Sequence, residues 1–177
     1  MRKIFIGLLC IMMSACNLVS SPGVYTSKDL KCSFKIPPGF TIVTEEPGDV
    51  IFARNDNKFK IAVIRLDLKK QITDENINQM SGAIVATSLG IENLYDINQV
   101  VKLYGNRQVS GRKAAWYYYP DEKNGVLVYV VFLPGNGNSL YQIAFFITPE
   151  ASSQYTDEVE QLVTLFLKDF KVKSSFF

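Results

Sequence analysis

The stretch "NGVLVYVVFLPGNGNSLYQIAFFITP", residues 124–149, contains two apolar runs of eight residues, 126–133 and 140–147. Between them lies "PGNGNS", a combination of residues that favours a tight turn, so the stretch predicts a β-hairpin. A strand with one solvated face alternates apolar and polar residues, whereas these runs are apolar almost throughout. We therefore expect both faces of this hairpin to be covered, which predicts a sheet with helices on both of its faces.

Further strands are predicted on either side of this hairpin. The segment "DVIFARNDNKFKIAVIRLDL", residues 49–68, reads as a second hairpin around "NDNK". In "LKCSFKIPPGF", residues 30–40, the Pro-Pro-Gly sequence should end a strand, because proline donates no ladder hydrogen bond. Residues 95–120 predict strands with a turn near "YGNR", and "DEKNG", residues 121–125, predicts the turn that leads into the central hairpin.

Two segments have helical periodicity instead. Apolar residues recur at helical spacing over residues 74–89, with Thr73 as a candidate N-cap and Gly90 as a candidate stop. A second helix lies within "SSQYTDEVEQLVTLFLKDF", residues 152–170. Its expected buried stripe is Tyr155, Val159, Leu162, Val163 and Phe166. Together the elements predict an α+β fold, an antiparallel sheet between helical layers in an α/β/α sandwich.

The N-terminus has the pattern of a secretory signal. Arg2 and Lys3 precede an apolar run of about ten residues, which is too short to span a membrane. The run ends at "MSAC", residues 13–16, which resembles the bacterial lipobox, in which the cysteine is lipidated and the chain is cut before it. We expect residues 1–15 to be a signal peptide and Cys16 to carry the lipid. An ordinary signal with an incidental cysteine is the alternative.

Lipidation at Cys16 implies a lasting anchor, because two or more acyl chains hold a protein stably to a bilayer. Asn17, and not Asp, follows Cys16, which in lipoproteins of the enteric type implies export to the outer membrane. We therefore expect a lipid-anchored protein of the bacterial cell envelope, on the periplasmic face of the outer membrane. Residues 16–23 would form a flexible tether, and residues 24–177 a single globular domain.

Charge and cysteine content argue against two features, a nucleic-acid partner and a disulfide bond. Without Arg2 and Lys3 the chain has 17 basic and 17 acidic residues, and this neutrality argues against nucleic acid as a partner. Of the three cysteines, Cys10 leaves with the signal and Cys16 carries lipid. Cys32 is therefore left without a partner for a disulfide, and we expect it to be a buried, inert thiol.

The sequence offers little for catalysis, since it contains no histidine. No phosphate-binding or dinucleotide-binding glycine motif is present. The carboxylate pairs Glu45-Glu46 and Asp121-Glu122 are expected to face water, and "NDNK" at 55–58 lacks the later glutamate of a calcium loop. We expect no metal, no cofactor and no enzymatic activity.

The densest group of aromatic residues is "AAWYYYP", residues 114–120. On a strand, Trp116 and Tyr118 share one face, and Tyr117 and Tyr119 share the other. These four residues are candidates for a partner or ligand surface, because tyrosine and tryptophan combine apolar bulk with a hydrogen-bonding tip. The alternative is that they pack in the core beneath a helix.

The order of these elements resembles the PsbP-like family over residues 24–173. The segments that carry the resemblance are "CSFKIPPGF", "VSGRKAAWYYY", "VLVYVVFLPGNGNSLYQIAFF" and "LKDFKV". That group includes extrinsic photosystem II subunits, DcrB-type bacterial lipoproteins and a small Ran-binding import factor of yeast. The resemblance implies an accessory or protein-interaction module without catalytic activity, with an envelope protein as its partner. The alternative is a lipoprotein that binds a small ligand.

Overall fold

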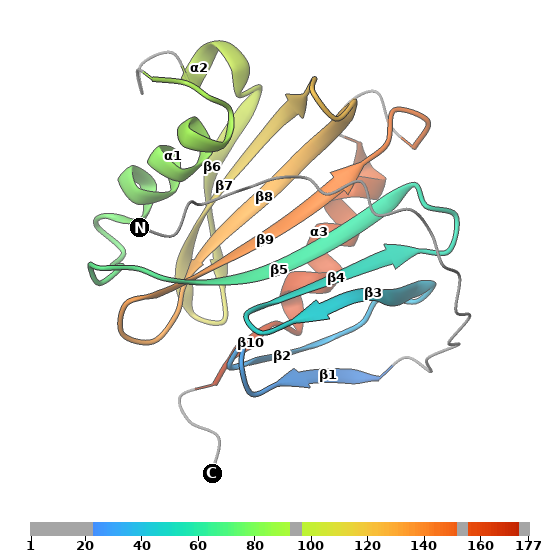
Figure 1. Ribbon diagram of the computed structural model, residues 1–177, viewed down its shortest axis with the longest axis horizontal. Helices are drawn as coiled ribbons and strands as arrows, with labels where there is room; N and C mark the ends of the chain where they lie inside the picture. The colour runs from blue at the N-terminus through green and yellow to red at the C-terminus, as the bar shows by residue number, and fades with distance from the viewer. Residues whose placement is uncertain (1–22, 93–96, 152–155, 174–177) are drawn as a thin grey trace.

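Figure 1 shows the computed structural model of the chain, which describes residues 23–92, 97–151 and 156–173. Seven antiparallel strands form a long sheet in the order β3-β4-β5-β9-β8-β7-β6, and a smaller sheet has the order β1-β2-β10. The strands are β1 Val24–Ser27, β2 Cys32–Lys35, β3 Phe40–Glu46, β4 Asp49–Arg54, β5 Phe59–Asp67, β6 Leu103–Val109, β7 Arg112–Asp121, β8 Val126–Pro134, β9 Ser139–Ile147 and β10 Lys171–Val172. The α+β class and the antiparallel sheet are confirmed.

The hairpin expected from residues 124–149 is β8 and β9, which pair from Leu127↔Ile147 to Pro134↔Leu140. On its other edge β9 pairs with β5, from Phe59↔Ile147 to Asp67↔Ser139. The hairpin therefore lies inside the sheet, and both of its strands are buried along most of their length. Its continuous apolar sequence follows from this position, because neither face is left to solvent.

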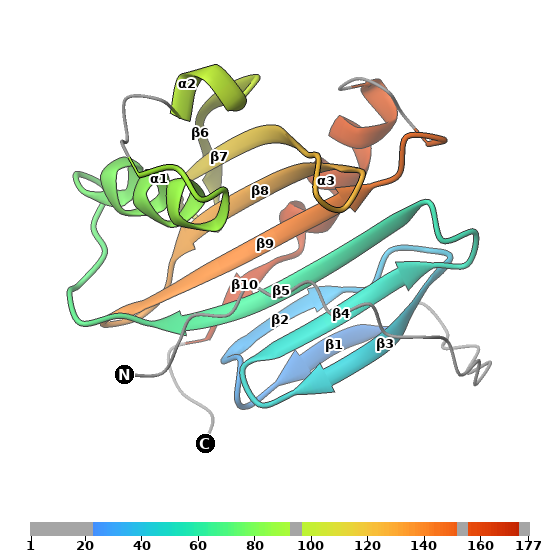
Figure 2. The same cartoon turned by 45° about the horizontal axis from the view of Figure 1, so that its top comes forward.

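Side chains that alternate along the central strands belong to two separate clusters. On β7, Ala115, Tyr117 and Tyr119 join a cluster with Ile77 and Val85 of helix α1, Ile77–Ser88. The neighbouring side chains of β7 join a larger cluster that includes residues of helix α3, Asp157–Lys168. Both clusters include residues of the central strands β7, β8 and β9, and Figure 2 shows the backbone of these strands with α1 and α3 from a tilted view.

The larger cluster also contains the small sheet, which differs from the expected three-layer sandwich. Tyr25, Cys32 and Phe34 of β1 and β2 lie in the same cluster as the buried side chains of α3. Strand β10, near the C-terminus, pairs with β2, near the N-terminal end of the described domain. The sequence predicted a helix alone on this side, but α3 is only twelve residues long and a second sheet shares the surface with it.

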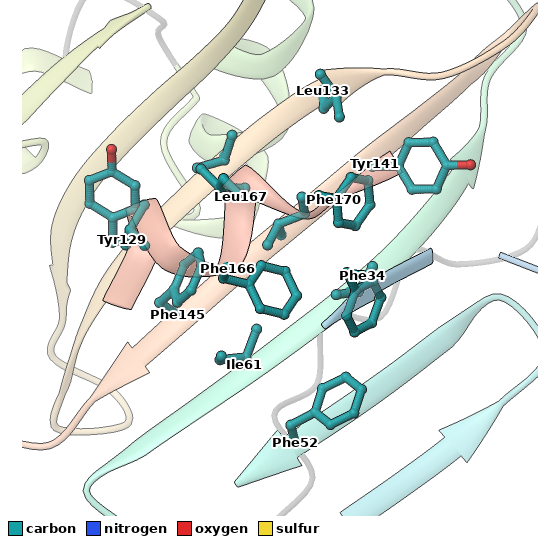
Figure 3. Packing of buried hydrophobic residues seen from close by; sticks show 14 of the residues in the cluster. Phe34, Phe52, Ile61, Tyr129, Leu133, Tyr141, Phe145, Phe166, Leu167 and Phe170 are labelled. Atoms are coloured by element: carbon teal, nitrogen blue, oxygen red, sulfur yellow. The ribbon is translucent and has the colours of Figure 1, made fainter. Parts of the chain in front are cut away.

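Figure 3 shows how side chains of α3, together with Phe170 two positions after the helix, pack in this cluster. Phe166 packs edge-on against Phe145 of β9, with ring centroids 5.7 Å apart, and also contacts Phe34. Phe170 stacks on Phe34 at 5.6 Å with an interplanar angle of 5°. The expected stripe is confirmed for its described members: Val159, Val163 and Phe166 are buried and Leu162 is partly buried, whereas Tyr155 lies outside the described residues.

Helix α1 begins three residues later than expected, at Ile77, after a turn over residues 74–76. The N-cap is therefore Asn76 and not Thr73 as expected, although the carbonyl of Thr73 accepts the amide of Ile77 at 3.0 Å. Gly90 ends the helix as predicted. It has φ +69°, and the amide of Ile91 reaches back to the carbonyl of Ala86 at 2.8 Å, a helix ending that needs a left-handed residue.

Two expectations for residues 95–120 are wrong. The residues "YGNR" lie inside β6 rather than in a turn, and the chain reverses at Ser110 and Gly111, which both have positive φ. The residues before β6 form a short helix, α2, Ile97–Val100, rather than a strand. The sequence "YGNR" looks like a turn only locally. In the sheet, the missing side chain of Gly105 instead makes room for Trp116 opposite.

The signal peptide, Cys16 and all of the tether except Gly23 lie outside the described residues. The carbonyl of Gly23 accepts the amide of Ile36 at 3.2 Å. Within the described ranges no helix is long and apolar enough to cross a membrane. Cys32 is fully buried in β2, as expected, and this burial raises the pKa of its thiol to about 12, which disfavours the reactive thiolate.

Candidate functional site

A cavity of about 330 Å³ opens where α1 and α2 meet β6 and β7, a corner visible in Figures 1 and 2. Ten residues line it: Asn78, Gln79 and Gly82 from α1; Ile97 and Asn98 from α2; Val101 after it; Tyr104, Gly105 and Asn106 from β6; and Tyr117 from β7. Pockets that take small ligands begin at about this size. This cavity is the candidate functional site.

Tyr117 closes the inner wall of the pocket. Its hydroxyl lies 3.0 Å from Ser81 Oγ and 3.1 Å from the carbonyl oxygen of Asn78, so two groups of α1 are within hydrogen-bonding distance of it. The ring is only 8% exposed, and burial raises the pKa of the phenol. Tyr117 is therefore a neutral hydroxyl held in a fixed position at physiological pH.

Four carboxamides surround the mouth: Asn78, Gln79, Asn98 and Asn106. They come from three elements that only the tertiary fold brings together. All four residues are exposed, and across the described residues none of their side chains takes part in a hydrogen bond to the protein. Each carboxamide offers two donor hydrogens and an acceptor oxygen. The rim is therefore rich in uncommitted hydrogen-bonding groups.

The apolar part of the pocket is formed by Ile97, Val101 and the ring of Tyr104. Tyr104 is 62% exposed, an unusual degree for such a large aromatic side chain. Its ring lies nearly parallel to that of Tyr117, at 20°, with centroids 6.4 Å apart. The exposed ring of Tyr104 thus lines the same cavity as the four carboxamides.

Gly82 is a glycine within a helix, where glycine costs about 1 kcal/mol relative to alanine. A Cβ at this position would lie 3.5 Å from the hydroxyl oxygen of Tyr117, an ordinary van der Waals contact. Packing within the fold therefore does not require glycine here. Because Gly82 lines the cavity, its missing side chain leaves space in the pocket itself.

The structure places the four predicted aromatic residues in two different surroundings, and only one of them in the pocket. Tyr118 and Tyr119 are buried, with 5% and 7% of their surface exposed. Trp116 is partly buried and stacks on Tyr129, with centroids 5.3 Å apart and an angle of 11°. Residues 116–119 thus pack mainly in the two core clusters, and Tyr117 alone contributes to the cavity.

The two carboxylate pairs lie away from the pocket and apart from each other in the sheet. Glu45 accepts the hydroxyl of Tyr25 at 2.6 Å, which links β3 to β1. Asp121 accepts the side-chain amide of Asn124 at 2.7 Å and so stabilises the turn before β8. Among the described residues, no group of three or more potential metal ligands occurs. One member of each pair, Glu45 and Asp121, therefore has a structural hydrogen bond.

Most of the pocket residues have no signal in the sequence that singles them out. Asn78, Gln79, Asn98 and Asn106 are isolated polar residues on three elements, and Tyr104 was expected near a turn. One signal was available: Gly82 interrupts the helical pattern of residues 77–88 without being near either end. A glycine at such a position indicates a packing or functional reason for the absence of a side chain.

No protein-family model matches the chain, and no curated protein matches its sequence. Among solved structures, the chain is similar to the cyanobacterial PsbP protein CyanoP of Synechocystis sp. PCC 6803. The match has a TM-score of 0.60 at 16% identity and covers 90% of this chain and 98% of that one. A protein of Bacteroides thetaiotaomicron VPI-5482 is similar with a TM-score of 0.54 at 11% identity, over 86% of this chain and 48% of that one.

The chain therefore spans about half the length of the Bacteroides protein and nearly all of CyanoP. At these identities the similarity shows the fold alone, since one fold carries many unrelated functions. The PsbP-like fold expected from the sequence is supported.

Proposed function

We propose that this protein is a non-catalytic binding module of the bacterial cell envelope, anchored by lipid at Cys16, that binds a small ligand in the pocket between α1, α2, β6 and β7. The observation that carries the proposal is the convergence of four uncommitted carboxamides and one fixed tyrosine hydroxyl on a single cavity. Ligand sites combine an apolar wall with a few placed polar groups in this way.

We also propose a family and a layer arrangement for the chain. It assigns the chain to the DcrB-type lipoproteins of the PsbP-like group, on the resemblance of the segments between residues 24 and 173. It also includes an arrangement in which α1 and α3 protect opposite faces of the long sheet. The separation of the buried residues into one cluster with α1 and another with α3 supports that arrangement.

A protein-interaction module is the second candidate, favoured by exposed apolar side chains on β1 and β3. Val24 is 64% exposed, Ile42 42% and Val43 55%. The two strands belong to different sheets and are linked by the hydrogen bond from the Tyr25 hydroxyl to Glu45. Exposed apolar groups that lie together are a common feature of protein interfaces.

The anchor is tested by Cys16→Ser. We expect the variant to lose metabolic labelling by a palmitate analogue and to leave the membrane fraction, because the sequence after residue 15 has 17 basic and 17 acidic residues and contains no long basic run that would bind anionic lipids. The control is Cys32→Ser, in which Cys16 is retained and labelling should persist. Labelling of the Cys16→Ser variant at the level of the wild type would show that lipid is attached elsewhere and would refute the anchor.

The pocket is tested by thermal unfolding in the presence of the small-molecule fraction extracted from the source bacterium's own envelope. A ligand at about 100 times its Kd stabilises the folded state by about 2.7 kcal/mol, which should raise Tm by about 5 °C or more. Gly82→Leu fills the cavity and should abolish the rise. Thr87→Leu places the same side chain on an exposed position of α1 outside the pocket and should leave the rise intact.

An equal rise in Tm for the wild type and Gly82→Leu would place the ligand elsewhere and refute the pocket. The second candidate would be favoured by two results together. The envelope fraction would raise the Tm of neither the wild type nor any variant, and an envelope protein that cross-links to the wild type would no longer cross-link to Ile42→Ser.

A further inference from the structure

The pocket has no charged residue among the ten that line it. Moving an ionised group out of water is costly unless an opposite charge or several hydrogen bonds meet it. A pocket of this composition therefore selects against phosphates, carboxylates and ammonium groups. Nucleotides, free amino acids and acidic sugars fit it poorly.

The rim suits a ligand that both donates and accepts hydrogen bonds at closely spaced positions. Asn78 and Gln79 are neighbours at the start of α1, while Asn98 and Asn106 approach from α2 and β6. Each carboxamide places donors and an acceptor side by side. Adjacent hydroxyl groups on a ring present the complementary arrangement, because each hydroxyl gives one hydrogen and accepts others.

Tyr117, on the inner wall of the pocket, adds a hydrogen-bond acceptor to the four carboxamides. Ser81 Oγ donates to the carbonyl of Ile77 at 2.6 Å, so its proton is committed within α1. The proton of the Tyr117 hydroxyl then goes to Ser81 Oγ or to the carbonyl of Asn78. In both cases a lone pair of the phenol oxygen stays available to accept a hydrogen bond from a ligand hydroxyl.

Tyr104 supplies the remaining feature, a flat apolar surface at the mouth. Its ring is well exposed and lines the same cavity as Asn98 and Asn106. A pyranose ring has C–H groups on one face that pack on an aromatic ring, while its hydroxyl groups point outward around the edge. Tyrosine suits this role because it combines ring area with low conformational entropy.

We infer that the pocket binds a neutral saccharide, with one sugar ring against Tyr104 and its hydroxyl groups at the carboxamides of Asn78, Gln79, Asn98 and Asn106. The inference rests on the proposed function of this pocket as a ligand site. A cavity of about 330 Å³ is at the lower end of the range for ligand pockets, which limits the bound portion to one or two sugar rings. Gly82 leaves room for that portion.

The experiment is saturation-transfer NMR on the full-length lipoprotein, solubilised in a detergent without a sugar headgroup. The probes are maltose, cellobiose and N,N'-diacetylchitobiose, with glucuronic acid as the charged probe and an uncharged, doubly capped tetrapeptide as the rival ligand. Each is added up to tens of millimolar. The proteins are the wild type, Gly82→Leu, Tyr104→Ala and Asn98→Ala, with Thr87→Leu as the matched control.

We expect at least one neutral disaccharide to receive saturation from the wild type and from Thr87→Leu. The signal should fall at least tenfold with Gly82→Leu and severalfold with Tyr104→Ala and Asn98→Ala. Tyr104 and Asn98 are exposed, so Tyr104→Ala and Asn98→Ala should keep the fold even if Gly82→Leu does not. Glucuronic acid should give no signal that depends on the pocket.

Two results would overturn the inference. If only the capped peptide or the glucuronic acid gives a signal that Gly82→Leu abolishes, the saccharide is wrong while the pocket stands as a ligand site. If no disaccharide gives a signal that depends on Gly82, Tyr104 and Asn98, the saccharide is wrong whatever the thermal experiment with the envelope fraction shows.

Discussion

Asp49 carries a carboxylate oxygen, Oδ1, that is buried and has no hydrogen-bond partner in the described part of the chain. It pairs across the hairpin with Glu46, so a like charge stands opposite it. Burial first, and then Glu46, raise the pKa of Asp49. Ionisation of this carboxyl therefore costs more in the folded state than in the unfolded chain.

We expect Asp49→Asn to stabilise the protein at pH 7 by on the order of 0.5 kcal/mol, a small value because the side chain is partly exposed. The gain should disappear as the pH falls below the usual carboxyl pKa near 3.8, since the wild-type residue is then neutral in both states. Urea unfolding of both proteins between pH 3 and pH 7 measures this. A loss of stability at pH 7 would contradict it.

Asp56 provides a control of opposite sign. Hydrogen bonds from the guanidinium of Arg54, then the amide of Lys58, lower the pKa of Asp56 to about 2. Its contribution to stability is present above a pH near 4 and is lost as the pH falls toward 2. Asp56→Asn should therefore destabilise the protein at pH 7, with no difference at the lowest pH.

At the scale of single elements, α3 is attached to the long sheet in two ways. Its apolar stripe enters the larger core cluster, and its polar side chains reach the sheet from its first turns. Arg54 pairs with Glu158 at 2.9 Å, and Arg107 of β6 pairs with Glu160 at 3.0 Å while also donating to the hydroxyl of Tyr129. Glu158 and Glu160 of α3 therefore both take part in ion pairs with strands of the sheet.

The apolar stripe supplies most of this attachment, because exposed ion pairs contribute between about 0 and 1 kcal/mol. We expect Phe166→Ala to lower the free energy of unfolding by about 3–5 kcal/mol, since it removes a fully buried ring. Leu165→Ala, one position earlier and 49% exposed, should cost less than about 1 kcal/mol. Denaturant unfolding monitored by circular dichroism provides the measurement. Equal, small losses for both variants would mean that α3 does not pack as described.

At the scale of the whole molecule, the two sheets share one core. The larger cluster includes side chains of β1, β2, the long sheet and α3, and β10 closes the small sheet against β2. Phe170 connects these parts. It is fully buried, stacks on Phe34 and meets Tyr141 edge-on at 5.5 Å. Neither sheet has a core of its own on this side, so the domain should unfold as one unit.

We expect the fluorescence of Trp116, in the long sheet, and the far-ultraviolet circular dichroism to give coincident unfolding curves. Phe170 lies outside the long sheet, yet Phe170→Ala should shift both curves together, because it should lower the free energy of unfolding of the whole domain by about 3–5 kcal/mol. Lys171→Ala, at the exposed neighbouring position, should leave both curves nearly unchanged. Separate transitions for the two probes in the variant would show that the small sheet unfolds independently.

The candidate site was predictable from the sequence only in small part. Residues 116–119 stood out as an aromatic group, and one of them, Tyr117, does line the pocket. The pattern of alternation separated the two faces of β7 correctly. It could not tell which face adjoins a cavity, because that depends on where α1 and α2 end and how far they stand from the sheet.

What the sequence determined by itself is local: the central hairpin, the helix stripe that ends in Phe166, the stop at Gly90 and the buried state of Cys32. Each depends on neighbouring residues, whose periodicity and turn chemistry are readable one segment at a time. Tertiary structure alone decided the pairing of β5 with β9, the closure of the small sheet by β10 and the meeting of four elements at the pocket. These contacts join residues far apart in the chain, so they depend on complementary side-chain packing and on loop closure, and no local pattern records either.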